Sequence, residues 1–308
     1  MHDVVGVYSS LDELVRLQFA ARGPGISGRQ PPTSVLAGRR TSRLRGRGLT
    51  FEELRLYRPG DDVRSIDWRV TARTGKAHTR VYTEERERPV LLVVDQRLGM
   101  FYGTQTQMKS VTAVEFAALV AWQVLATGDR IGATVFNDAQ LTEIDPHRSR
   151  GTVLRLLDAL VGFNRALSVN GGVEPSADQL DHVLTGVAAR ATHDWLIVII
   201  SDFQGLSEST TRHLRNIARH NDVIAALVHD PSAQVLPHRS RSIISDTRRQ
   251  AEIDLSDSHT REVLLDQLRQ RQSFLQTLRR ELGVPCLALD TRGDVATQLA
   301  NQLGQVSR

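Results

Sequence analysis

Short apolar runs alternate with stretches of helical spacing from Pro89 to the end of the chain. An apolar run of four to eight residues is typical of a buried strand, and apolar residues recurring every three or four positions are typical of a helix. The pattern predicts five strands, over Val90–Asp95, Ile131–Phe136, Trp195–Ser201, Val223–Val228 and Val284–Leu289. It predicts helices over Val111–Ala126, Thr152–Phe163, Ala177–Ala189, Leu206–His220, Val263–Leu282 and Val295–Leu303. Fully apolar strands in alternation with helices predict an α/β domain of the doubly wound, Rossmann type, whose mostly parallel sheet is covered on both faces.

The first 88 residues lack this alternation, so we expect a smaller N-terminal module over residues 1–88 and the α/β domain over residues 89–308. Helical spacing over Leu11–Ala21, preceded by Ser10 as N-cap, predicts one helix. Residues 23–48 are rich in Gly, Pro, Ser and Arg, which favours a surface loop. Phe51–Tyr57 fits a helical turn or a strand, and a polar hairpin is expected over His78–Glu87.

The composition is that of a globular domain. The 308 residues are 40% hydrophobic and 24% charged, which excludes collagen-like and wholly disordered chains. Continuous apolar runs such as Val90–Val94 and Leu196–Ile200 are much shorter than the roughly 18 residues of a membrane-spanning helix, so no membrane span is expected. The first residues do not resemble a signal peptide, and the single Cys286 cannot form an internal disulfide. These features predict a cytoplasmic protein.

Positive charge is concentrated near the start of the chain, whose formal net charge is +4. Residues 22–50 contain seven Arg and no acidic residue, a pattern that could contact phosphates. No aromatic residue is interleaved with these arginines and no zinc-ligand spacing is present, so nucleic acid is not the expected partner. Only Lys76 and Lys109 are lysines, and the general preference for Arg leaves the role of residues 22–50 open.

The most specific stretch is FEELRLYRPGDDVRSIDWRVTAR, over residues 51–73. It resembles the signature of the bacterial family called domain of unknown function 58, in which a Tyr-x-x-Gly-Asp-Asp-x-Arg-x-Ile-Asp-Trp-Arg block precedes a von Willebrand factor A-like domain. The resemblance continues through Gly128–Gly132 and Ser201–Phe203. The signature residues are Tyr57, Gly60, Asp61, Asp62, Arg64, Asp67, Trp68, Arg69 and Arg73.

The signature block is dense in opposite charges. Planar guanidinium groups pair with carboxylates in bidentate geometry, so its three Asp and five Arg predict an ion-pair network. Ile66 and Trp68 could then anchor the segment on the α/β domain. The block is either such an internal clasp or a surface for a protein partner.

The resemblance also implies a place to look for a metal. Von Willebrand factor A-like domains often carry a metal-ion-dependent adhesion site whose first loop reads Asp-x-Ser-x-Ser. Here Asp95 is followed by Arg97 and Gly99 at the two serine positions, Val173 stands where a Thr is common, and Asp202 matches the third loop. Two carboxylates without hydroxyls, beside a guanidinium, make a poor Mg²⁺ cage. We therefore expect a degenerate site with no metal and no other cofactor.

Arg97 is the candidate substitute for the missing cation. Asp95 and Asp202 would repel each other at adjacent strand ends, and a guanidinium between them would offset that repulsion. Mg²⁺ should then leave the wild type unaffected and partly rescue Arg97→Ser. The alternative is that Arg97 points into solvent or toward a partner.

Enzymatic motifs are missing from the sequence. It has no Gly-x-Ser-x-Gly nucleophile elbow and no Gly-x-x-x-x-Gly-Lys phosphate loop, so we expect no catalytic residues. The resemblance implies a non-enzymatic adaptor that works with a MoxR-type AAA+ ATPase in the assembly or activation of an unidentified client protein. The alternative is a metal-dependent binding or hydrolytic protein that uses Asp95 and Asp202.

Overall fold

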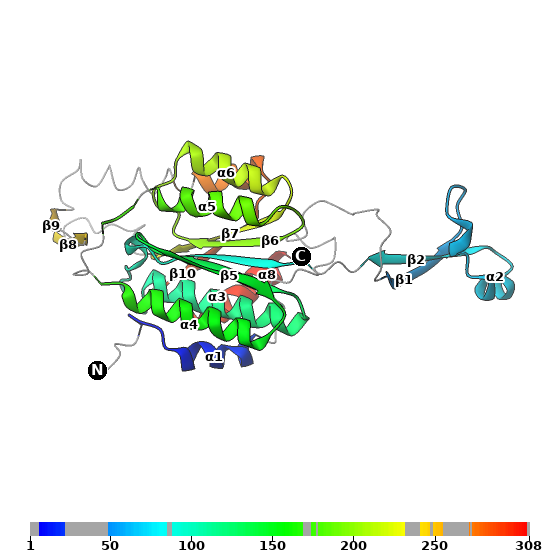
Figure 1. Cartoon of the computed structure of the whole chain (residues 1–308), viewed down its shortest axis with the longest axis horizontal. Coiled ribbons are helices and arrows are strands. Elements are labelled where there is room, and N and C mark those ends of the chain that lie inside the picture. Colours follow the sequence, from blue (N-terminus) through cyan, green and yellow to red (C-terminus); the bar gives the residue numbers. More distant parts are fainter. Residues whose placement is uncertain are drawn as a thin grey trace. The chain divides into compact units, whose positions relative to one another are not determined.

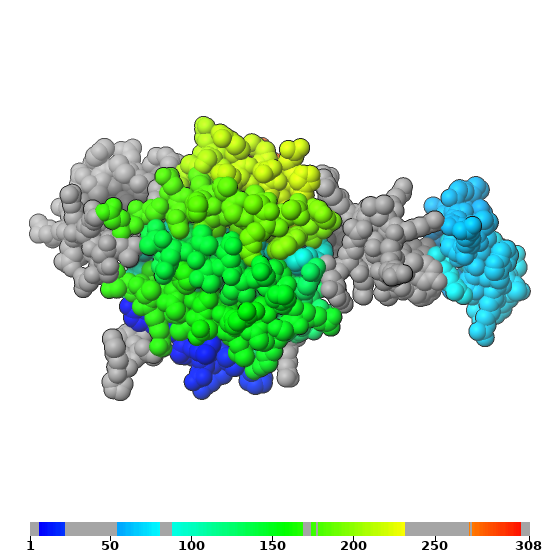
Figure 2. Space-filling model, in the orientation of Figure 1, coloured from blue at the N-terminus to red at the C-terminus, as the bar shows by residue number. Residues whose placement is uncertain are grey.

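The computed structural model describes residues 6–21, 49–84, 88–168, 174–176, 178–231, 241–246, 249–254, 271 and 273–306. The chain forms two compact units, residues 1–38 with 88–308, and residues 39–87. We call the second one the signature unit. Figures 1 and 2 show the whole chain.

A six-stranded sheet forms the centre of the larger unit, in the order β10-β7-β6-β3-β4-β5 (Figure 1). Its strands are β3 (Val90–Asp95), β4 (Ile131–Phe136), β5 (Leu141–His147), β6 (Leu196–Ser201), β7 (Asp222–His229) and β10 (Cys286–Asp290). Neighbouring strands are parallel except β4 and β5, which are antiparallel. All five predicted strands are present, and the mostly parallel, doubly wound α/β fold is confirmed.

Helices cover both faces of this sheet, as Figure 1 shows. On one side lie α1 (Leu11–Ala20), α3 (Lys109–Thr127), α4 (Arg150–Ala166) and α8 (Val295–Val306), and on the other lie α5 (Gln179–Arg190) and α6 (Glu208–Ala218). β3 divides its side chains between the two cores: Val90, Leu92 and Val94 pack into the first, and Leu91 and Val93 into the second. Burial on both faces is the reason that this strand is apolar throughout.

Helix α1 belongs to the α/β unit. Ser10 and Glu13 form a capping box at its start, and Leu14 is fully buried in the core beside α3. The indole Nε1 of Trp122 in α3 donates to the Leu14 carbonyl at 2.9 Å. We predicted that this helix belongs to an N-terminal module over residues 1–88. That prediction is wrong, because the apolar face of α1 packs on α3 and α4 of the α/β unit. The start of the α/β fold near residue 88 agrees with the prediction.

The signature unit contains a two-stranded antiparallel sheet of β1 (Leu49–Leu56) and β2 (His78–Glu84). Between the strands lie the 3₁₀ turn η1 (Val63–Ser65) and the short helix α2 (Trp68–Thr74). Asp67 is the N-cap of α2, and Gly75 ends it with φ of 68°, a left-handed conformation that suits glycine. The strand alternative for residues 51–57 is thus the one observed.

Three of the observed strands were not predicted. β5 (LTEIDPH) is mostly exposed at the sheet edge and contains Pro146, which an edge strand tolerates and a central one does not. β8 (Arg241–Asp246) and β9 (Arg249–Asp254) form a separate antiparallel pair. The predicted loop over residues 23–48 lies outside the described residues, as do residues 263–270 and 272 of the predicted helix over residues 263–282. Residues 273–281 of that helix are helical.

Helix α3 is the core helix of the larger unit. Among the described helices it alone is long and apolar enough to cross a membrane by length and composition. However, 78% of that apolar window is buried inside the structure, against the sheet and the helices α1 and α4. The 3₁₀ turn η2 (Leu98–Met100) precedes α3 and lies in the loop that carries the candidate site.

Candidate functional site

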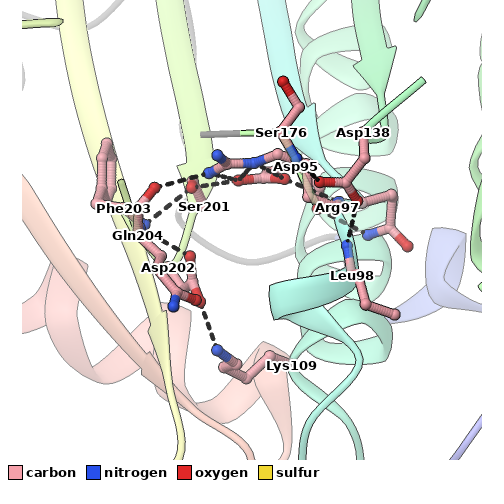
Figure 3. A network of polar contacts seen from close by, with 11 residues as sticks. Asp95, Arg97, Leu98, Lys109, Asp138, Ser176, Ser201, Asp202, Phe203 and Gln204 are labelled. Carbon is pink, nitrogen blue, oxygen red and sulfur yellow. Dashed lines mark hydrogen bonds and ion pairs between the residues drawn. The ribbon is translucent and has the colours of Figure 1, made fainter. Parts of the chain in front are cut away.

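Two buried carboxylates lie at the carboxyl ends of the central strands β3 and β6. Asp95 is the last residue of β3, and Asp202 follows the last residue of β6. The two strands are parallel neighbours, which brings these strand ends to the same edge of the sheet. Ligands of doubly wound sheets bind at this edge. Figure 3 shows the two carboxylates and their partners.

Arg97 holds Asp95. Its Nε and one terminal nitrogen donate to the Asp95 carboxylate at 3.0 and 2.7 Å, and its backbone N–H donates to Oδ1 at 2.9 Å. Burial acts to lower the pKa of the Arg97 guanidinium, but the charge and hydrogen bonds of Asp95, together with the charges of Asp202 and Asp138, outweigh burial and raise that pKa. Arg97 therefore stays charged and neutralises Asp95 from within the chain.

Lys109 holds Asp202. Its Nζ lies 2.5 Å from Oδ2 of Asp202, and both side chains are buried. Burial acts to raise the pKa of Asp202, but the charge and hydrogen bond of Lys109, together with the charges of Arg271 and Arg97, lower it to about 2. The predicted bridge by Arg97 is thus wrong for Asp202, because a second cation, from the first residue of α3, occupies that carboxylate. Sequence reasoning missed Lys109, although it is one of only two lysines in the chain.

The loop after β6 completes the network. Ser201 Oγ donates to Asp95 Oδ2 at 2.6 Å and accepts from the Phe203 backbone N–H at 2.9 Å. Phe203 has a positive φ of 52°, which is uncommon outside glycine and turns the chain back. The Gln204 carbonyl then accepts from the Arg97 guanidinium at 3.1 Å. The β6 loop is thereby tied to the β3 loop through Arg97.

A third carboxylate positions the rim of the site. Asp138, in the turn after β4, accepts from the backbone N–H groups of Leu98 at 2.6 Å and Ser176 at 2.9 Å. It therefore joins η2 to the segment before α5. Sequence reasoning missed Asp138, because nothing near it signals contacts with residues so distant in the chain.

The remaining strand-end carboxylates, Asp230 and Asp290, accept hydrogen bonds from loop residues. Asp230, after β7, accepts from the Thr104 N–H and from the Thr291 hydroxyl, each at 2.9 Å. Asp290, at the end of β10, accepts from the backbone N–H groups of Arg292 and Gly293. The contacts of Asp290 are the loop-starting role expected for Asp after a strand, whereas Asp230 joins loops that are distant in the sequence.

The signature unit holds the ion pairs expected of its sequence. Arg55 makes a bidentate pair with Asp61, at 2.7 and 2.8 Å. Arg80 donates to Asp67 at 2.8 Å, and Asp67 also accepts from two backbone N–H groups at the start of α2. Hydrogen bonds from these arginines lower the pKa of both carboxyls. Arg80 lies outside the signature block and was not predicted.

The other signature residues shape the turn or face solvent. Asp62 accepts from the Arg64 N–H at the start of η1, and Gly60 has a φ of 105° that glycine adopts without strain. The Tyr57 N–H donates to the Ala77 carbonyl at 2.9 Å. The side chains of Arg64, Trp68, Arg69 and Arg73 are exposed. Docking of Trp68 against the α/β domain stays a prediction.

The family can now be assigned. The model of the family "Protein of unknown function DUF58" matches residues 53–273, which is most of the chain. The chain belongs to the DUF58 family. The match begins within β1 and extends beyond β9. It therefore includes Asp95 and Asp202, the two carboxylates of the strand-end site.

DUF58 relatives align along most of this chain. The uncharacterized proteins Rv1480 of Mycobacterium tuberculosis and Mb1516 of Mycobacterium bovis are each 32% identical over 286 residues, which cover 91% of this chain and 86% of theirs. Among solved structures, BatB from Bacteroides thetaiotaomicron is similar with a TM-score of 0.40 and 10% identity, covering 71% of this chain and 98% of its own. A von Willebrand factor type A protein from Catenulispora acidiphila has a TM-score of 0.32 and 13% identity, covering 75% and 44%.

The strand-end site of this DUF58 chain does not fit a divalent cation. Asp95 accepts hydrogen bonds from Arg97 and Ser201, and both oxygens of Asp202 are engaged as well. A Cβ added at Gly99 would approach Gln204 Oε1 to 2.7 Å, so the Gln204 amide lies where a serine would begin. Within the described part of the chain, no cluster of three or more His, Cys, Asp or Glu could hold a metal. Val173 lies outside the described residues.

Proposed function

We propose that this chain is a non-enzymatic protein-interaction adaptor that works with a MoxR-type AAA+ ATPase on a client protein. The observation that carries the proposal is the pairing of both strand-end carboxylates with the chain's own cations, Arg97 with Asp95 and Lys109 with Asp202. A metal centre would bind its ligand through the ion, whereas here both carboxylates are already neutralised inside the fold, which favours contact with a protein over metal-mediated binding. The ATPase as partner rests on the family resemblance.

The adaptor proposal is tested with two purified proteins, this chain and the MoxR-type ATPase of the same organism. We expect a complex on size exclusion and a changed ATP hydrolysis rate when the chain is added. The matched control is bovine serum albumin in place of the chain, which should change neither readout. Failure to form a complex at tens of micromolar of both proteins would contradict the ATPase partnership.

The competing assignment, a metal-dependent binding or hydrolytic protein, is tested separately. Calorimetric titration of the chain with Mg²⁺, Mn²⁺ and Ca²⁺ should give no binding heat, because Asp95 and Asp202 are both occupied. Binding that disappears in Asp95→Ala would favour the metal-dependent protein over the adaptor.

A further inference from the structure

The signature unit presents apolar side chains to solvent. The exposed fractions are 60% for Val63 and 68% for Trp68. Exposing a large aromatic side chain costs hydration free energy unless a partner covers it, and Trp is among the residues that contribute most to protein interfaces. Val63 and Trp68 flank the exposed Arg64, and Arg69 and Arg73 follow on α2. We call these five residues the signature surface.

The arginines of this surface are not used inside the unit. Residues 54–80 contain seven Lys and Arg against three Asp. Asp61 and Asp67 are taken by Arg55 and Arg80, and Asp62 caps η1. Arg64, Arg69 and Arg73 have no ion-pair partner among the side chains that the structure describes. The unit therefore keeps an excess of exposed positive charge beside exposed apolar surface.

The arrangement on α2 places two charges together. Arg69 and Arg73 are four residues apart, so they lie on one face of the helix. Two like charges at this spacing repel each other, and no acidic residue of α2 offsets them. A carboxylate supplied from outside the unit would remove this repulsion.

We propose that the signature surface binds an acidic patch of a partner protein, with Trp68 in an apolar depression and Arg64, Arg69 and Arg73 on surrounding Asp or Glu side chains. This inference rests on the proposed adaptor function and specifies the chemistry of its partner. The unit already shows the pairing chemistry twice, in Arg55 with Asp61 and Arg80 with Asp67. Guanidinium groups suit bidentate carboxylate recognition better than ammonium groups do.

A protein partner accounts for these features better than nucleic acid or lipid does. Stacking on single-stranded nucleic acid uses several aromatic residues along a groove, and α2 has one. Insertion into a bilayer surface uses a broad apolar helix face, and the seven residues of α2 include only Trp68, Val70 and Ala72 as apolar side chains. Both remain as outcomes of the test.

The test measures binding of the full chain to three defined probes: a Glu-rich peptide carrying Leu and Phe, vesicles rich in phosphatidylglycerol, and duplex DNA. We expect the acidic peptide to bind and its Gln-for-Glu counterpart to bind far more weakly. Trp68→Ala and the double variant Arg69→Glu/Arg73→Glu should each weaken peptide binding by about tenfold or more. Binding of the wild type should weaken between about 0.1 and 0.5 M salt.

The matched control is Arg155→Glu/Arg212→Glu, which reverses two exposed arginines on α4 and α6 of the other unit and should leave peptide affinity unchanged. Circular dichroism checks that every variant is folded. Peptide affinity that is equal in wild type and the surface variants would overturn the proposal. Preference for vesicles or DNA, lost in the same variants, would also overturn it and assign the surface to that ligand.

The two proposals can fail separately. If the acidic peptide binds through Trp68, Arg69 and Arg73 while the ATPase does not bind, the surface stands and the ATPase partnership falls. If the ATPase binds the wild type and both surface variants equally, the adaptor function stands and the signature surface falls.

Discussion

Two buried cations decide the character of the strand-end site. Lys109 and Arg97 are each held against one carboxylate, and the pairs are completed by Ser201 and the Gln204 backbone. A buried ion pair is costly to break, because removing one partner leaves the other charge without compensation in a low-dielectric interior. The site is therefore a structural element of the core, and single substitutions there test how much it contributes to stability.

Lys109→Met should lower the free energy of unfolding by about 3–5 kcal/mol at neutral pH, because Asp202 is left buried and charged. Urea unfolding followed by circular dichroism measures the change. The chain provides its own control in Lys76, the other lysine, which is exposed. Lys76→Met should change stability by less than about 0.5 kcal/mol, and equal effects of the two substitutions would contradict the pairing.

The loss from Lys109→Met should shrink in acid. In the wild type the pKa of Asp202 is lowered from 3.8 to about 2, so its stabilisation is present above the unfolded value and is lost as pH falls toward 2. Without Lys109 this pKa should rise, because burial is then opposed only by the charges of Arg271 and Arg97, and protonation relieves the variant as pH falls. Urea unfolding of both proteins at pH 7 and pH 4 should show a smaller difference at pH 4. A constant difference would contradict the assignment to Asp202.

Removal of Arg97 should also destabilise the chain, with Arg97→Ala costing about 3–5 kcal/mol because Asp95 loses its cation. Rescue of Arg97→Ser by Mg²⁺ was expected on sequence grounds, but Lys109 still occupies Asp202 in that variant. We therefore expect Mg²⁺ to raise the thermal midpoint of Arg97→Ser/Lys109→Ser only. A similar rise for the wild type would show that the cations do not replace a metal.

At the scale of elements, α1 is a part of the α/β core that precedes the signature unit in sequence. Its buried Leu14 lies in the core with α3, and Trp122 donates to the Leu14 carbonyl. The same hydrophobic core thus contains residues of α1 and residues from β3 onward, which lie on either side of the signature unit in the sequence. Stability of the larger unit must depend on this helix.

Leu14→Ala should lower the free energy of unfolding by about 2–5 kcal/mol, the usual range for a cavity left by a buried leucine. Phe19 is the matched control, since it lies on the same helix and is 64% exposed. Phe19→Ala should have little effect. Chemical denaturation of both variants measures the difference, and a loss smaller than about 1 kcal/mol for Leu14→Ala would show that α1 is not part of the core.

At the scale of the whole molecule, the question is whether α3 packs in the core or crosses a membrane. It has the length and composition of a membrane-spanning helix, yet most of its apolar window is covered by the sheet and by neighbouring helices. The apolar side chains of α3 therefore pack in the core of the folded unit, and little of their surface is accessible to lipid.

We predict that α3 stays in the folded core and does not anchor the chain in a membrane. Burial of α3 supplies the physical reason, because a core helix cannot leave the fold without exposing the sheet. Fractionation with a high-salt wash measures the distribution, and salt removes proteins held to the membrane by surface charge alone. Retention in the membrane fraction after that wash would contradict the prediction.

The sequence alone was sufficient for the parallel strands, since β3, β6 and the other central strands are apolar enough to be buried on both faces. It also indicated the family through residues 51–73, and it placed Asp95, Arg97 and Asp202 at one edge of the sheet, because parallel strands share their carboxyl ends. Tertiary structure decided the pairing. Lys109 lies 93 residues before Asp202, and Arg80 lies 13 residues after Asp67. Trp122, which contacts α1, lies 108 residues after Leu14. Such contacts depend on how packed elements orient their side chains, and local periodicity carries no information on that orientation.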